Sequence, residues 1–387
     1  MVKPRLYICI KCPFTERDYE RMGVRYLDQL FDLKILDCTA WLFPQAIKTR
    51  NWQAFAHPAV RHVSSYTQLL SELTGCRGAH AIDYVGPFSL RAIAMFHAIK
   101  SKGGKLVVID NGAHPQHCSN AHISTKRKFV RAISNPALIR QHLNARLIGL
   151  AVSLLPDQAP DIAFVAGTSW KDNARLASAR RQIAVHSFDY EQAIGIKRAP
   201  RLVEGPYVVY LDEKITSHED DVELGLCQPA TDNRFFSTLR EMFEYCEHHL
   251  KMPVVVAGYP SSETSKLAQQ VGQRRVFIGQ TGVLLRDANL VLAHSSTALS
   301  YAAIFRRPVV LLTSNEIASS SYQLTINAMR DALSVDMISL NETETYAHVA
   351  SARVNENAYE TFCRKFITSN CGDASMWSTI ARTLHET

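Results

Sequence analysis

Hydroxyl side chains at the start of an expected helix are the clearest sign of ligand chemistry in this sequence. The segment "NLVLAH" (residues 289–294) predicts a buried strand that ends at His294, after which Ser295, Ser296 and Thr297 open a helix. A helix start offers unpaired N–H groups and a partial positive charge, so it favours a phosphate, and small hydroxyl side chains add donors. An ordinary Ser/Thr N-cap explains the local pattern equally well. The sequence therefore predicts a nucleotide-binding loop here, with a simple cap as the alternative.

A carboxylate follows another apolar run. Residues 105–109 predict a strand, and Asp110 comes directly after it. A positioned carboxylate can take the proton of a sugar hydroxyl, and partial burial would raise its pKa. Asp-Asn-Gly is also a hairpin signal, but the residues that follow do not form a strand pattern. We therefore expect Asp110 to be a general base.

The two segments together resemble the GT-B glycosyltransferases, which have two α/β domains facing a cleft and bind the nucleotide on the second. "HSSTALSYAAIFRRPVVLL" (residues 294–312) is similar to their donor-site pattern. It also resembles the serine-rich motif of bacterial sialyltransferases and Kdo transferases, which use CMP-sugars. "VVIDNG" (residues 107–112) resembles the acidic motif of that group, in which an acidic residue acts as base. The resemblance implies that Asp110 is this base, although Asn111 departs from the acidic second position.

A third segment matches the same group less closely. "VVVAGYP" (residues 254–260) occupies the place of its His-Pro motif, which contacts a phosphate. The resemblance implies that Gly258, Tyr259 and Pro260 lie at the nucleotide. Tyr259 stands where the group has histidine, which puts the phosphate contact at this position in question.

The loop that follows Asp110 belongs to the acceptor side in this family. The resemblance implies that Asn111, Gly112, His114 and His117 face the acceptor. H-x-x-H followed by Cys118 could also hold a metal ion, but the spacing matches no standard zinc signature. We therefore expect loop histidines that contact an anionic acceptor, with no metal and no cofactor.

The elements that must position these residues form two similar halves. A chain of 387 residues suits two domains, and strands alternate with helices throughout, which is typical of parallel α/β sheets. A polar, proline-marked stretch near residues 196–206 indicates the boundary. We expect an α/β fold with two Rossmann-like domains, at residues 1–200 and 201–375. A final helix, residues 376–387, is expected to cross back to the first domain.

The composition limits the partners. With 47% apolar and 20% charged residues the chain is globular, and its net charge of +7 suits a nucleotide, an anionic sugar or an anionic membrane surface. No motif accompanies this charge that would indicate nucleic-acid binding. Residues 122–155 mix basic with apolar side chains, which favours either a peripheral lipid contact or a solvated helical excursion. We expect a cytoplasmic protein, at most peripheral at the inner face of the membrane.

The predicted function is transfer of a sugar from a nucleotide-activated donor, first of all CMP-Kdo or a CMP-nonulosonate, to a saccharide or lipid-linked saccharide acceptor. The resemblance places this reaction in the synthesis of bacterial capsule, O-antigen or lipopolysaccharide. Three alternatives stay open: a transferase that uses UDP- or GDP-sugars, a UDP-sugar 2-epimerase of the same fold, and a catalytically degenerate partner protein.

Overall fold

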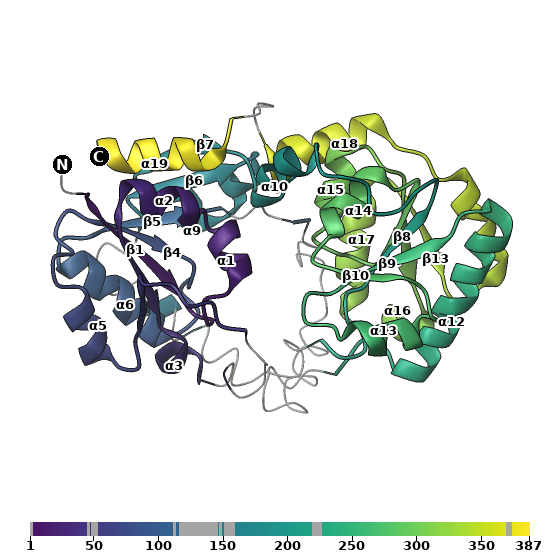
Figure 1. The fold of residues 1–387 in the computed structure, drawn as a ribbon, viewed down its shortest axis with the longest axis horizontal. Coiled ribbons are helices and arrows are strands. Elements are labelled where there is room, and N and C mark those ends of the chain that lie inside the picture. Colours follow the sequence, from purple (N-terminus) through teal and green to yellow (C-terminus); the bar gives the residue numbers. More distant parts are fainter. Residues whose placement is uncertain are drawn as a thin grey trace. The chain divides into compact units, whose positions relative to one another are not determined.

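The computed structural model describes residues 3–44, 47, 53–110, 114–115, 146, 149–150, 159–218, 227–368 and 374–387. Its residues fall into two compact units (Figure 1). The first unit comprises residues 1–111, 121–185 and 372–387, and the second comprises residues 112–120 and 186–371. Each unit is built around its own parallel sheet, as the alternating pattern predicted.

The sheet of the first unit has seven parallel strands in the order β3-β2-β1-β4-β5-β6-β7. Its central strands β4 and β6 are buried along their whole length, and β1 and β5 are buried at all but their first residue, as expected for strands covered on both faces. The strands are β1 (Arg5–Ile10), β2 (Asp32–Asp37), β3 (Val60–His62), β4 (His80–Asp83), β5 (Lys105–Ile109), β6 (Ile162–Ala166) and β7 (Arg181–Val185). The helical segments are α1 (Glu16–Arg21), α2 (Val24–Leu30), α3 (Thr39–Leu42), α5 (Tyr66–Glu72), α6 (Leu90–Ser101), η1 (Ser169–Asp172) and α9 (Ala174–Ala177).

The final helix, α19 (Met376–Glu386), belongs to the first unit, as expected, and packs against α2. Its apolar face buries Trp377, which is 2% exposed. Gly23 lies directly against this indole, because a Cβ at Gly23 would lie 2.1 Å from the Trp377 ring. Gly23 also has a φ of +62°, which glycine adopts without strain. The residue type at position 23 therefore lets the C-terminal helix dock.

The sheet of the second unit has six parallel strands in the order β10-β9-β8-β11-β12-β13. The strands are β8 (Val208–Leu211), β9 (Val254–Gly258), β10 (Val276–Ile278), β11 (Leu290–Ala293), β12 (Val309–Thr313) and β13 (Asp336–Ser339). The helical segments are α10 (Phe188–Ile196), α12 (Asp232–Tyr245), η2 (Cys246–Leu250), α13 (Thr264–Gln270), α14 (Thr281–Asp287), α15 (Leu299–Ile304), α16 (Asn315–Ala318), α17 (Tyr322–Leu333), η3 (Thr343–Ser351), α18 (Glu356–Phe362) and η4 (Cys363–Ile367).

Both sheets reverse their strand order once, between β1 and β4 in the first unit and between β8 and β11 in the second. Open α/β sheets bind ligands at such switch points, outside the carboxyl ends of the strands. The residues just after β8 and β11 are therefore the first place to look for a site in the second unit.

The contacts divide the chain at residues 185/186, earlier than the predicted boundary at residues 200/201. Helix α10 packs against α14 and α15. The Ser300 hydroxyl donates to Asp189, and the Tyr301 hydroxyl donates to Gln192, each over 2.5 Å. The proline-marked stretch is thus a loop inside the second unit. Across the part of the chain that the structure describes, no helix combines the length and the apolar character that a membrane span requires.

Candidate functional site

His294 follows β11 at the switch point of the second sheet, but its side chain faces inward. The imidazole is fully buried. Its Nδ1 donates to the Leu312 carbonyl over 2.7 Å, and its Nε2 lies 3.2 Å from the Tyr210 hydroxyl, which donates to it. Burial lowers the pKa of His294 to about 4, so the ring is neutral at pH 7. The prediction that His294 contacts the nucleotide is corrected: both of its ring nitrogens hold the strand end in place.

The backbone donors of this loop are occupied by a carboxylate of the chain itself. Glu213, two residues after β8, accepts the N–H of His294 over 2.9 Å and the N–H of Ser295 over 3.1 Å. The Tyr322 hydroxyl donates to the same carboxylate. Burial raises the pKa of Glu213 to about 6, although these hydrogen bonds oppose the rise. Helix α15 begins only at Leu299, so Ser295, Ser296 and Thr297 precede the helix and do not open it as predicted. Glu213 takes the N–H groups of the first two residues after β11.

The three hydroxyl residues of this loop differ in how far they are exposed to solvent. Ser295 is 9% exposed, and its hydroxyl donates to Tyr322 over 2.8 Å. Ser296 is half-buried and its hydroxyl accepts the N–H of Ala298 over 3.3 Å, whereas Thr297 is exposed. Of the four predicted residues in this loop, Ser296 and Thr297 are therefore the two that a ligand can reach.

The loop after β9 is tied to Asp212, the residue that follows β8. Asp212 accepts the N–H of Tyr259 over 3.3 Å and the hydroxyl of Ser262 over 3.0 Å. Gly258 is buried, and a Cβ there would lie 2.4 Å from Ile278 Cδ1, so glycine serves the packing of β9 against β10. Tyr259 is half-buried and Pro260 is exposed. The predicted segment thus lies at the carboxyl edge of the sheet, where Asp212 fixes its turn.

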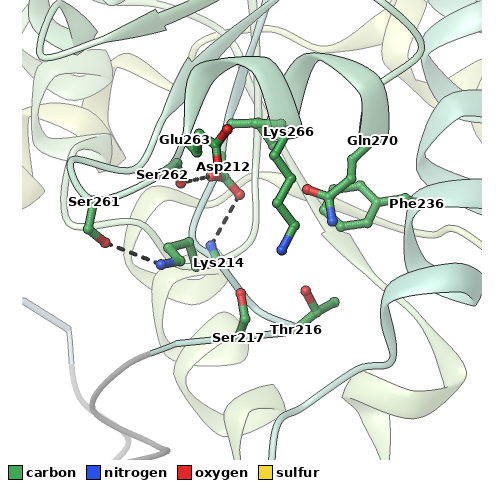
Figure 2. A pocket seen from close by; sticks show the side chains of 11 residues that line it. Asp212, Lys214, Thr216, Ser217, Phe236, Ser261, Ser262, Glu263, Lys266 and Gln270 are labelled. Atoms are coloured by element: carbon green, nitrogen blue, oxygen red, sulfur yellow. Dashed lines mark hydrogen bonds between the residues drawn. The ribbon is translucent and has the colours of Figure 1, made fainter. Parts of the chain in front are cut away.

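A pocket of about 220 Å³ opens at this edge, between the loops after β8 and β9 and the start of α13. Figure 2 shows the Lys266 side chain extending into it from α13. Lys214 donates to the Ser261 hydroxyl over 3.2 Å, which holds its ammonium group at the rim. The lining is polar except for two apolar side chains: Asp212, Lys214, Thr216, Ser217, Phe236, Ser261, Ser262, Glu263, Lys266, Leu267 and Gln270. Sequence reasoning missed this pocket.

Asp110 lies at the carboxyl end of β5, as predicted, and is 8% exposed. Its N–H donates to the Phe164 carbonyl over 2.7 Å, and its Oδ2 accepts the N–H of Ala166 over 3.3 Å. His114 is half-buried. The described residues do not include Asn111, Gly112 or His117, and of the predicted segment 122–155 they include residues 146, 149 and 150, all exposed.

A further carboxylate ends β4, which lies beside β5 in the first sheet. Asp83 ends β4 and is paired with Arg175 over 2.6 Å, and it accepts the N–H of Val85 over 2.7 Å. Within the described ranges, no three His, Cys, Asp or Glu side chains are grouped so that they could hold a metal ion. Cys9 is buried in β1, and burial raises its pKa, whereas Cys12 is half-buried. Neither thiol is in a disulfide.

Comparison with known proteins bears on the fold. No protein-family model matches the chain, and no curated protein matches its sequence. The UDP-GlcNAc 2-epimerase of Methanocaldococcus jannaschii is 11% identical, with 99% of this chain and 100% of that chain covered and a TM-score of 0.51. The H444N variant of the wall teichoic acid polymerase TagF is also 11% identical, with 99% and 88% covered and a TM-score of 0.51.

MurG of Acinetobacter baumannii is 8% identical, with 99% of this chain and 100% of that chain covered and a TM-score of 0.45. None of these three proteins is a sialyltransferase or a Kdo transferase. The two parallel sheets with the same strand-order reversal, together with the first two likenesses, establish that this chain has the two-domain α/β fold called GT-B.

Proposed function

We propose that this protein is a glycosyltransferase that moves a sugar from a nucleotide-activated donor to a saccharide acceptor. The observation that carries the proposal is the polar pocket with two lysines at the carboxyl edge of the second sheet, within a GT-B fold. On the same edge, Ser296 and Thr297 follow β11 and remain accessible. This edge offers the positive charge and the hydroxyl donors that nucleotide phosphates require.

The second unit would hold the leaving group. A departing nucleotide gains negative charge on its phosphate, and preorganised donors stabilise that charge in the transition state. The ammonium groups of Lys214 and Lys266 and the hydroxyls of Thr216 and Ser217 line one pocket and can serve this purpose. Because Glu213 occupies the N–H groups of His294 and Ser295, we assign the phosphate mainly to these side chains.

The first unit would activate the acceptor. Asp110 takes the proton of the attacking hydroxyl, whose oxygen then bonds to the anomeric carbon while the bond from that carbon to the donor phosphate breaks. Asn111, Gly112, His114 and His117 follow Asp110 in the chain and belong, in this proposal, to the acceptor side. No metal ion and no cofactor takes part.

The donor proposed first is CMP-Kdo or a CMP-nonulosonate, on the strength of the sequence resemblance of residues 107–112 and 294–312. The product would be a capsule, O-antigen or lipopolysaccharide chain. The proposed location is the cytoplasm, with residues 122–155 touching the inner face of the membrane. A UDP- or GDP-sugar is the next donor to test.

Thermal unfolding with CMP, CDP, UDP, GDP and dTDP tests the donor site. A ligand that binds only the folded protein at about 100 times its Kd adds about 2.7 kcal/mol of stability. We expect CMP to raise the Tm, and Lys266→Ala and Ser296→Ala to weaken this effect. Lys365→Ala, an exposed lysine outside the pocket, is the matched control. If none of the five nucleotides raises the Tm, the donor-site assignment is wrong.

A 2-epimerase is the second candidate, because the epimerase of M. jannaschii shares the fold. Turnover separates the two functions. An epimerase converts UDP-GlcNAc with no acceptor present, whereas a transferase releases its nucleotide in proportion to the acceptor added. A protein that binds nucleotide but consumes no donor would be the degenerate partner of an assembly complex.

A further inference from the structure

A second pocket, of about 540 Å³, lies in the first unit at the carboxyl ends of β1, β2 and β3. It is separate from Asp110, which follows β5. Its lining is mainly apolar and comes from three parts of the chain: Pro13, Phe14, Asp37, Ala54, Phe55, Ala56, His57, Pro58, Val60 and His62. The function proposed above makes no use of this pocket.

Aromatic rings form the wall of the pocket. Phe14 is 2% exposed, and its ring centroid lies 6.2 Å from those of Phe55 and His57. Tyr19 packs behind them, 5.4 Å from Phe55 and 5.6 Å from His57. The N–H of Phe55 donates to the Phe14 carbonyl over 2.8 Å, so the loop that carries Phe55 is fixed to the end of β1. The half-buried rings of Phe55 and His57 are therefore held in place against the buried Phe14.

A polar pair lies at the same pocket. Asp37, which ends β2, is 5% exposed and accepts the N–H of Thr39 over 3.0 Å through Oδ1. Its Oδ2 lies 3.1 Å from Nδ1 of His62, the last residue of β3. In neutral His62 the proton must sit on Nδ1 to make this bond, so Nε2 carries the lone pair. The His62 side chain is 80% exposed, so its Nε2 is available to a ligand.

A sugar ring fits this combination. A pyranose has one face of C–H groups, which packs on aromatic rings, and a rim of hydroxyl groups, which need acceptors and donors. A purely apolar ligand would form no hydrogen bond with the imidazole of His62, which Asp37 orients. We propose that this pocket binds a sugar ring of the acceptor, with its C–H face on Phe55 and a hydroxyl donating to His62 Nε2. The proposal rests on the transferase function, for which it names an acceptor subsite.

Saturation-transfer NMR on the full chain tests the subsite. The probes are the methyl β-glycosides of glucose, galactose and N-acetylglucosamine, with cytidine and uridine added as nucleobase probes. We expect saturation to reach the ring C–H protons of at least one glycoside. Phe55→Ala and His62→Ala should each raise its Kd at least tenfold, whereas Phe55→Tyr should retain binding. Tyr66→Ala removes a ring that is 40% exposed and lies outside the pocket, so it serves as the control.

Three outcomes overturn the proposal: no glycoside receives saturation, binding survives Phe55→Ala, or the nucleosides bind here in place of the sugars. Tryptophan emission during unfolding checks that each variant folds. The nucleotide-dependent rise in Tm should be the same in the Phe55 and His62 variants as in the unmodified chain. Nucleotide binding without glycoside binding would remove the subsite and keep the transferase. Glycoside binding without any nucleotide effect would remove the transferase and keep a sugar-binding pocket.

Discussion

Replacing Glu213 by Gln should change how stability depends on pH, and the direction follows from the structure. The pKa of Glu213 rises from 4.5 to about 6 on folding, mainly through burial. The folded chain therefore holds this proton more tightly than the unfolded chain does. The resulting stabilisation is fully present below pH 4.5 and is lost as the pH rises through 6. At about 1.36 kcal/mol per pKa unit it amounts to about 2 kcal/mol.

His294 has the opposite effect. Its pKa falls from 6.5 to about 4, so the stability that it contributes is present above pH 6.5 and is lost as the pH falls through 4. The size of that loss is about 3 kcal/mol. In the unmodified chain, protonation of Glu213 offsets part of it. Glu213→Gln keeps the shape of the side chain but removes this offset. Between pH 7 and pH 4 the variant should therefore lose about 2 kcal/mol more stability than the unmodified chain.

Urea unfolding at half-unit steps from pH 4 to pH 7 measures the difference. Trp41, Trp170 and Trp377 belong to the first unit, so their emission follows that unit. Far-UV circular dichroism follows both units, so a transition that it shows and tryptophan emission does not belongs to the second unit. Glu244→Gln, at an exposed glutamate of α12, is the control and should leave the pH profile unchanged. Parallel profiles for Glu213→Gln and the unmodified chain would refute the role assigned to this carboxylate.

Three further predictions concern other parts of the chain. Asp110→Asn should lower turnover by about 10²–10⁴-fold while nucleotide binding is retained, and full activity of this variant in a donor-consumption assay would exclude Asp110 as the base. Gly23→Ala should destabilise the first unit by roughly 2–5 kcal/mol, because φ is +62° and the added Cβ meets Trp377. An unchanged urea midpoint in tryptophan emission would contradict that account. Transfer measured with and without EDTA should be equal, and loss of activity that Mg²⁺ restores would show that a metal takes part.

The alternation of strands and helices was enough to predict two parallel sheets, because apolar runs such as residues 105–109 and 290–293 match strands of these sheets. It was not enough to predict Glu213, since the contact of this residue with Ser295 depends on β8 lying beside β11 in the sheet. Strand order is a property of the folded sheet, and two residues 82 positions apart carry no local signal of it. The lysine-lined pocket was missed for the same reason, since its two sides come from loops that follow different strands.

Local cues also misled where packing overrode them. The sequence predicted a ligand contact for His294 because this residue follows an apolar strand. Its side chain instead points into the core, where the ring bonds to Tyr210 and Leu312. The polar stretch near residues 196–206 looked like a linker, yet Arg286 donates to the carbonyls of Ile196 and Ala199, each over 2.6 Å. A polar sequence can thus form part of a packed unit when a half-buried arginine donates to its carbonyl groups.

The return of the chain to the first unit has a consequence for how the protein can be divided. Because Gly372–Thr387 completes the first unit, the main part of the second, from His186 to Cys371, lies between two segments of the first. That segment carries its own sheet and core, so it should fold when produced alone. A fragment that stops at Val185 would instead expose the surface that Met376, Trp377 and Ile380 cover. Proteolytic removal of the last helix should therefore lower the stability of the first unit, although most of that unit lies at the other end of the sequence.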